Sequence, residues 1–382
     1  MNRLRWIPAM VVTAMLAGCS LPSLSKDSTV VQSTNTKDKE ETTIIPSMQI
    51  DNQYYRTLLP YKESASRGLI VSNINTKYDI KEAESGLLRL SQQAFDPDKY
   101  FFQEGQYLDK NTVNSWLARS SQDPAGLNPK TTKNMSPTER AKTAPIYLAH
   151  IVEQNYLQKT GKNKVKLAGV SIGLALNSVY YYQKEQYGAT YEEPIPQAIL
   201  DAQGKKIAAQ VVKRLRQIDG LSEVPITVGL FKQQSRSAIV PGTYFAYTNV
   251  DQGSAQIKDW KKINEEYVLF PTSDANNKYR DINENFNYFK QDIDKYFSNY
   301  TNIVGTGFYQ NNKIQKLEIQ IPIKFYGSSE IIGFTQYMSG EVMDQFPKGL
   351  QVEVNVTSIN GPEALVVKEA NADEPYIHIY ND

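Results

Sequence analysis

The clearest periodic pattern lies in the last third of the chain. Apolar residues recur there at spacings of three and four, as on one face of a helix: Ile282, Phe286, Phe289, Ile293, Tyr296 and Tyr300. Alternating apolar and polar residues over 317–325 then predict a strand with one buried face, paired with 304–309 through a hairpin at Asn311 and Asn312. A helix capped by Ser328 or Ser329 and strands over 352–356, 365–367 and 376–380 complete the predicted set.

A similar order of patterns precedes this region. Ser136 and Pro137, followed by Glu139, are typical of a helix start. We therefore expect a helix from 137 to about 159 that is disturbed near Pro145, a strand over 170–176, a helix from Pro196 to about Gly220, and strands over 226–230 and 244–247.

These patterns predict an α/β protein of the α+β type. The order helix, strand, helix, strand, strand occurs at 136–250 and again at 278–382, so we expect two related units with mainly antiparallel sheets. Residues 251–277 are expected to link them. A small N-terminal α/β region is expected at 47–135, with a helix over about 80–95 whose capping box is formed by Asp79 and Glu82.

The beginning of the chain has the pattern of a secretory signal. Basic residues precede an apolar run, and the run ends in Leu16-Ala17-Gly18-Cys19, which resembles a bacterial lipobox. The resemblance implies cleavage between Gly18 and Cys19 and attachment of a diacylglycerol to the Cys19 sulfur, so that residues 1–18 form the signal peptide. The polar composition of 19–46 predicts a flexible tether. No later apolar run is long enough to span a bilayer.

The charge balance and the cysteine content exclude some classes of function. The chain carries 42 basic and 41 acidic residues, so its net charge gives no general attraction to nucleic acid or anionic lipid. Cys19 is the only cysteine, and once it is lipidated no thiol remains for a disulfide, a nucleophile or a metal ligand. His150, expected on a helix, and His378 are the only histidines and lie far apart in sequence. We therefore expect neither a metal site nor a cofactor.

The chain contains one match to a catalytic motif. Residues 169–173 match the Gly-x-Ser-x-Gly nucleophile elbow, and His378 could complete a triad with Ser171. An elbow needs a sharp turn from strand to helix, whereas the alternation continues here to Leu176. We therefore expect Ser171 inside a strand, where small residues allow close packing. A binding or scaffolding module is the preferred interpretation, and a cell-surface hydrolase acting on wall polymer or peptide is the alternative.

Clustered tyrosines supply the candidate ligand contacts. Their rings offer stacking faces and polar tips, which suit a cell-wall sugar or a peptide. Ordinary strand preference for tyrosine is the competing explanation. The candidate binding residues are Tyr180, Tyr182, Tyr187, Tyr191 and Tyr244.

Several of these features together resemble one family. The lipobox at Cys19, the polar tether, the segment 101–108 (FFQEGQYL), the region 169–182 and the two C-terminal units are similar to the CamS family of sex-pheromone-precursor lipoproteins. The resemblance implies anchoring on the outer face of a Gram-positive cell membrane. It also implies that a hydrophobic heptapeptide, here 12–18, is released from the signal peptide and induces conjugative plasmid transfer. It implies no catalytic residues.

Overall fold

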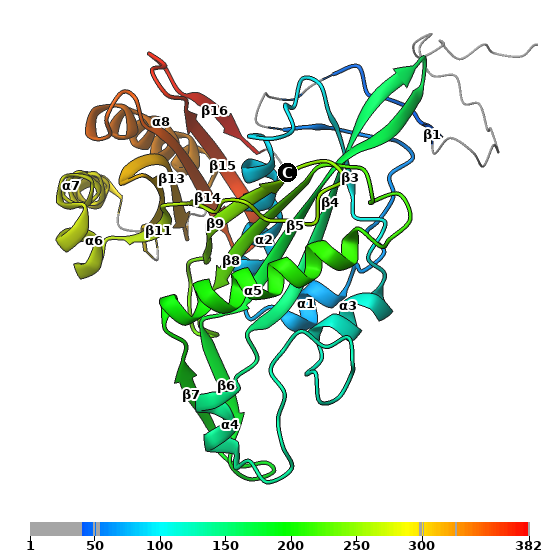
Figure 1. Ribbon diagram of the computed structural model, residues 1–382. Coiled ribbons are helices and arrows are strands. Elements are labelled where there is room, and N and C mark those ends of the chain that lie inside the picture. The colour runs from blue at the N-terminus through cyan, green and yellow to red at the C-terminus, as the bar shows by residue number, and fades with distance from the viewer. Residues whose placement is uncertain are drawn as a thin grey trace, which may run out of the picture.

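The computed structural model describes residues 40–48, 50, 54–297, 300, 302–324 and 327–380 (Figure 1). In these ranges the chain is a mixed α/β protein with eight helices and three sheets. None of these helices combines the length and the apolar character needed to cross a bilayer.

The first sheet has eight strands. Its order is β10 (Lys261–Lys262), β9 (Thr243–Val250), β8 (Ile226–Gln233), β5 (Lys164–Asn177), β4 (Leu148–Gly161), β3 (Phe101–Glu104) and β2 (Arg56–Thr57), with β1 (Glu40–Thr42) added to β5. The neighbours β5 and β8 are parallel, as are β2 and β3, and the remaining pairs are antiparallel.

Both faces of the first sheet are covered by helices. On β8, the consecutive residues Leu230 and Phe231 point to opposite faces and are both fully buried. Leu230 belongs to the core beneath α5 (Gln197–Leu215), and Phe231 belongs to the core beneath α2 (Lys77–Ser91). Two short helices, α1 (Leu69–Asn73) and α3 (Lys110–Leu117), contact β4, and a third, α4 (Pro137–Thr143), contacts residues 179–183.

The helix predicted over 137–159 is wrong beyond its first two turns. Helix α4 ends at Thr143, and β4 begins three residues after Pro145. The first ten residues of β4 are all buried, because layers cover the sheet on both sides. Buried polar residues, among them His150, Glu153 and Asn155, replace apolar ones in this run, so no period of two revealed the strand. His150 accordingly lies on a strand and not on a helix.

The second sheet has six strands. Its order is β11 (Glu265–Phe270), β12 (Val304–Gln310), β13 (Lys313–Pro322), β14 (Gln351–Ser358), β15 (Gly361–Lys368) and β16 (Tyr376–Ile379). Only β13 and β14 are parallel within it. Helices α7 (Arg280–Tyr296) and α8 (Ser328–Gln345) share one core with the buried face of this sheet. Helix α6 (Ser273–Lys278) precedes α7.

The hairpin predicted in this unit is confirmed, whereas two other predictions differ from the structure. The hairpin between β12 and β13 turns at Asn311 and Asn312, which both have positive φ. The N-cap of α8 is Gly327, however, and neither Ser328 nor Ser329. Residues 251–277, predicted as a linker, carry β10, β11 and α6, and β11 is the edge strand of the second sheet.

The prediction of two related units is confirmed, with a corrected order of elements. Each unit has an antiparallel strand pair, a crossover helix, a strand parallel to the second one, and a final antiparallel strand. The first series is β4-β5-α5-β8-β9, and the second is β12-β13-α8-β14-β15. The first unit also carries β6 (Val179–Gln183) and β7 (Thr190–Pro194), a separate two-stranded sheet inserted before α5.

Helix α2 joins the two units. Its N-cap is Thr76, whose hydroxyl accepts a hydrogen bond from the Asp79 N–H, so the predicted cap at Asp79 is wrong. The Asp79 carboxylate instead accepts hydrogen bonds from the backbone N–H groups of Gly242 and Gln234. Farther along α2, Arg89 forms ion pairs with Glu82 at 2.5 Å and with Glu265 of β11 at 2.8 Å.

Candidate functional site

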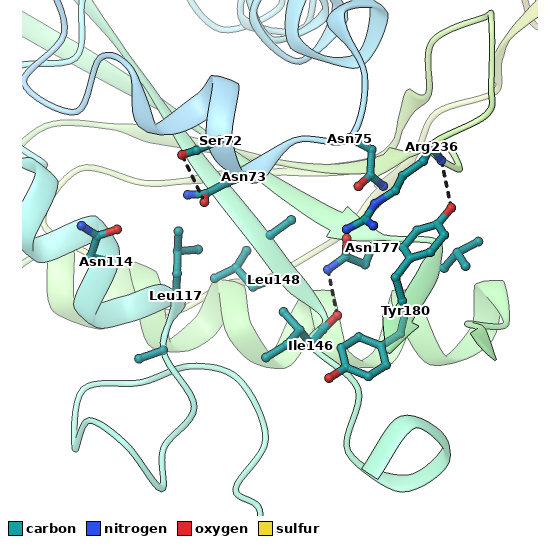
Figure 2. A pocket seen from close by; sticks show the side chains of 14 residues that line it. Ser72, Asn73, Asn75, Asn114, Leu117, Ile146, Leu148, Asn177, Tyr180 and Arg236 are labelled. Carbon is teal, nitrogen blue, oxygen red and sulfur yellow. Dashed lines mark hydrogen bonds between the residues drawn. The ribbon is translucent and has the colours of Figure 1, made fainter. Parts of the chain in front are cut away.

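A hollow of about 430 Å³ opens at one end of the first sheet (Figure 2). It lies where the parallel strands β5 and β8 both reach their carboxyl ends, at Asn177 and Gln233. The crossover from β5 through α5 to β8 creates this edge, and such edges are the usual ligand sites of α/β sheets. The lining residues come from α1, α3, β4, β5, β6 and adjoining segments: Ser72, Asn73, Asn75, Asn114, Leu117, Ala118, Ile146, Leu148, Ala149, Asn177, Val179, Tyr180, Tyr181 and Arg236.

The floor of the hollow is held by a chain of amide side chains. Asn177 donates through Nδ2 to the Ile146 carbonyl at 2.9 Å, and its Oδ1 accepts from Gln233 Nε2 at 2.5 Å. Gln233 Oε1 in turn accepts from the Asn75 N–H at 2.9 Å, and Asn75 Nδ2 donates to the Gln234 carbonyl. These bonds join the ends of β5 and β8 to the loop before α2, and fix the floor in one arrangement.

One wall is aromatic and carries the only charged side chain of the lining. The backbone N–H of Arg236 donates a hydrogen bond to the Tyr181 hydroxyl at 2.9 Å. The central carbon of the Arg236 guanidinium lies 4.2 Å from the centre of the Tyr181 ring. Tyr180 is placed by Arg119, which donates to its hydroxyl at 3.3 Å and to the Ala144 carbonyl at 2.7 Å. Among the described residues, no aspartate or glutamate lines the hollow. The polar groups of the lining are therefore amides, phenols, the Ser72 hydroxyl and a single guanidinium, beside apolar side chains such as Leu117 and Leu148.

Three of the candidate tyrosines come together on the β6–β7 hairpin. The rings of Tyr180 and Tyr182 are stacked with centres 6.3 Å apart, and the Tyr182 and Tyr191 centres are 5.7 Å apart. Of these three, Tyr180 lines the hollow. Tyr187 lies at the turn of the hairpin and is 91% exposed. Ligand contact by these side chains remains a prediction.

Tyr244 does not join that cluster. It is buried on β9 against Phe231, and its hydroxyl donates to the Ala83 carbonyl at 2.6 Å. Tyr244 also borders a second hollow, of about 270 Å³, between the two units, together with Arg89, Lys261 and Gln310. Arg89 is already paired with Glu82 and Glu265, so its charge is used within the protein. We therefore interpret the second hollow as a part of the contact between the two units.

No local sequence pattern singled out Asn75, Asn177 or Arg236 as site residues. Asn177 directly follows the predicted strand 170–176, and the strand predicted from 226 leads to Gln233. The sequence feature that could have located the site is therefore the pair of polar residues that end two buried strands. This feature predicts a site only if the two strands are known to be parallel neighbours, and the pattern of an individual strand does not show which strand it pairs with.

Ser171 and His378 do not form a catalytic pair. Ser171 is fully buried on β5, where its hydroxyl accepts a hydrogen bond from Ser91 at 2.7 Å, whereas His378 is exposed on β16 of the other sheet. The prediction of close packing is confirmed. A Cβ on Gly169 would lie 2.1 Å from the Phe95 ring, and one on Gly173 would lie 2.4 Å from the Tyr244 hydroxyl.

His150 is buried as well. It is 2% exposed on β4, its Nδ1 has no hydrogen-bond partner in the described structure, and burial lowers its pKa to about 4. Within the described ranges, no three histidine, cysteine, aspartate or glutamate side chains are placed to hold a metal ion together. Gly18 and Cys19, the predicted cleavage and lipidation positions, lie outside the described residues.

Comparison with known proteins places the chain in a family. The family described as "CamS sex pheromone cAM373 precursor" matches residues 61–374. The chain is similar to the crystal structure of a sex pheromone precursor from Lactobacillus salivarius subsp. salivarius UCC118, with a TM-score of 0.82 and 32% identity, covering 90% of this chain and 99% of that one.

A second solved structure agrees with the first. The C-terminal domain of the sex pheromone staph-cAM373 precursor from Staphylococcus aureus has a TM-score of 0.71 and 33% identity, covering 81% of this chain and 99% of that one. The search of curated proteins found no match. The family match and these two likenesses, which extend over most of the chain, establish that it belongs to the CamS sex pheromone precursor family.

Proposed function

We propose that the protein is a lipoprotein anchored through Cys19 on the outer face of the cell membrane, and that its folded body binds a polar fragment of the cell wall. The observation that carries the binding role is the hollow at the carboxyl ends of β5 and β8, with its amide floor and its Tyr181–Arg236 wall. The lipid anchor is supported by the lipobox and by the family to which the chain belongs.

The ligand chemistry follows from the lining. Asparagine amides both donate and accept hydrogen bonds, which matches the hydroxyl and N-acetyl groups of a sugar. Tyrosine rings provide a stacking face for a pyranose ring. Arg236 is available to pair with a carboxylate, because the part of the chain that the structure describes places no acidic residue in the lining to compete for it. A wall oligosaccharide that carries a lactyl or peptide carboxylate meets all three requirements.

A hydrolase has no comparable support. The CamS family is not a family of enzymes, and the lining lacks the pair of carboxylates that glycoside hydrolysis normally uses. Ser171 is buried away from the hollow, so it is not available as a nucleophile there.

Calorimetric titration tests the binding role. The mature chain is titrated with a soluble disaccharide-peptide fragment of peptidoglycan and, separately, with an N-acetylglucosamine oligomer. We expect saturable binding of the first, weakened about tenfold by Arg236→Ala and by Tyr181→Ala. The matched controls, Arg280→Ala and Tyr376→Ala, change exposed residues of the second unit and should bind like wild type. Absence of binding, or equal losses in the control variants, would overturn the assignment.

The lipid anchor has its own test. Mass spectrometry of the protein isolated from membranes should find a chain that begins at Cys19 with a diacylglycerol on its sulfur. An intact leader or a bare thiol at position 19 would contradict the proposal.

A second function concerns the cleaved signal peptide. The solved relatives are sex pheromone precursors, which favours release of a pheromone peptide from this chain too. Here it would be Val12-Thr13-Ala14-Met15-Leu16-Ala17-Gly18. Synthetic peptide of this sequence should raise the frequency of conjugative plasmid transfer from responsive donor cells, and a scrambled peptide should not. Equal transfer with both peptides would exclude this role.

A further inference from the structure

The tip of the β4–β5 hairpin carries a cluster of positive charge. Lys159, Lys162, Lys164 and Lys166 are all exposed, and no acidic residue occurs between positions 157 and 168. The protein as a whole is close to neutral, so this end of the first sheet concentrates charge that the net balance conceals. Exposed lysines on a projecting hairpin can reach a flat surface together.

The same hairpin tip is where the N-terminal segment joins the fold. Strand β1 pairs with β5 so that Glu40 lies opposite Lys166 and Thr42 lies opposite Lys164. Figure 1 shows β1 beside this end of the hairpin. Even with Glu40 and Glu41 counted, the four lysines leave an excess of positive charge. Cys19 precedes Glu40 by 21 residues, a chain that reaches at most about 75 Å.

The candidate binding hollow lies at the opposite end of the sheet. Strand β5 runs from Lys164 near the hairpin tip to Asn177 in the floor of the hollow. At about 3.3 Å per residue, these two ends are about 43 Å apart. We call Lys159, Lys162, Lys164 and Lys166 the lysine tip. If the lysine tip contacts a surface, the hollow therefore faces away from that surface.

We propose that the lysine tip binds the anionic lipid headgroups of the membrane that carries the anchor, and that this contact directs the hollow toward the cell wall. The proposal rests on the lipid anchor at Cys19, which confines the tip near the membrane. Electrostatic contact of this kind is local, because the Debye length is about 8 Å at physiological ionic strength. It is therefore sensitive to salt and to the fraction of anionic lipid.

Two labelled chains test the orientation. Lipidation of Cys19 uses the only native thiol, so Thr160→Cys at the tip and Gln186→Cys on the β6–β7 hairpin each provide one site for a fluorophore. Both native residues are exposed. Each lipidated chain is inserted into phosphatidylcholine vesicles with or without 30% phosphatidylglycerol, all containing a lipid with a quencher on its headgroup.

We expect quenching at position 160 to be at least threefold stronger with phosphatidylglycerol than without it, and quenching at position 186 to be independent of it. The triple variant Lys159→Gln, Lys162→Gln, Lys166→Gln should lose this dependence. A matched triple variant at the other end of the unit, Lys130→Gln, Lys133→Gln, Lys142→Gln, should retain it. Equal quenching at 160 and 186, or no effect of phosphatidylglycerol, would overturn the proposal.

Two further experiments distinguish lipid headgroups from a wall polymer and test the lysine tip without the lipid anchor. If soluble poly(glycerol phosphate) changes the signal at position 160 while phosphatidylglycerol does not, the tip binds a wall polymer and the membrane assignment is wrong. The mature chain with Cys19→Ser measures the tip without any anchor. It should sediment with phosphatidylglycerol vesicles at least threefold more than the same chain with the first triple substitution, and equal sedimentation would contradict the proposal even if Cys19 proves not to be lipidated.

Discussion

The two units share one topology but cover their sheets differently. In the first unit, helices pack on both faces of the sheet, and neighbouring strand residues such as Leu230 and Phe231 are both buried. In the second unit, α7 and α8 pack on one face, and buried and less buried residues alternate along β12 to β15. The sheet with two covered faces is also the one that carries the candidate binding hollow and the lysine tip.

This difference suggests a division of roles. A sheet fixed on both faces is a stiff support, so the amide floor at its edge keeps its geometry when α1, β6 or the loop after β8 contacts a ligand. The outer face of the second sheet is polar: Lys316 pairs with Glu318 and with Glu353 there. That face lies toward α2, because β11 contributes Glu265 to the ion pairs of Arg89 and Tyr267 to a hydrogen bond with Glu82.

Truncations on the two faces of each sheet should give the largest effects and test this comparison. In the first sheet, Leu230→Ala and Phe231→Ala should each lower the free energy of unfolding by about 2–5 kcal/mol, because both leave cavities. In the second sheet, Ile319→Ala should cost a similar amount, whereas Glu318→Ala on the outer face should cost less than about 1 kcal/mol. Urea denaturation measures all four. A small loss for either residue of the first pair would mean that one face is not part of the core.

The ion pairs between the units should give the next largest effect. Arg89→Ala leaves Glu82 and Glu265 buried without their cation, which typically costs 3–5 kcal/mol. Because 31% of the Arg89 side chain is exposed, we expect the lower end, about 3 kcal/mol. Burial raises the pKa of Glu82, while Arg89 and Tyr267 act to lower it.

The matched control for Arg89 is Arg280→Ala. Its ion pair with Glu284 is exposed on one turn of α7 and should contribute only about 0.3–0.5 kcal/mol. Equal losses for the two arginines in urea denaturation would show that the ion pairs do not join the units.

A pH effect of about 2 kcal/mol is expected from His150 in the first sheet. Burial lowers its pKa to about 4, against a reference value of 6.5, so the folded chain binds fewer protons than the unfolded chain between these values. Stability from this group is complete above pH 6.5 and decreases as the pH falls. Between pH 7.5 and 5 the loss is about 2 kcal/mol.

The comparison of variants isolates this effect from the titration of other groups. His150→Gln should make the free energy of unfolding less dependent on pH over that range, while His378→Gln changes an exposed side chain and serves as the control. Identical pH profiles for wild type and His150→Gln would show that folding does not shift the pKa of His150, and would contradict its burial as a neutral side chain.

The same structural difference decides what the sequence could predict. Where one face of a sheet is buried, alternation identifies strands directly, as over 317–323. Where both faces are buried, apolar and polar residues do not alternate, as in the run from Leu148 to Leu157. The helix start at Ser136 was identified correctly, but no pattern marked the end of the helix, so the predicted helix ran on into β4. The capping box at Asp79 failed for a related reason: the side chain serves a distant loop at Gly242, a contact that local spacing cannot show.

The candidate site was predictable only in part. The tyrosine cluster on 180–191 was visible as composition, and it borders the hollow through Tyr180. The amide floor depends on three segments that meet only because β5 and β8 are parallel neighbours. That pairing is a long-range property, and so the roles of Asn75 and Asn177 could not be derived from local patterns.

NMR spectroscopy can map ligand contact in both units of the protein at once. Amide and asparagine side-chain NMR signals of the mature chain are followed during titration with the disaccharide-peptide fragment. We expect chemical-shift changes confined to the first unit, at Asn75, Asn114, Asn177 and Arg236, with the signals of β11–β16 unchanged. Shifts that concentrate in the second unit, or in the hollow around Lys261 and Gln310, would contradict this expectation.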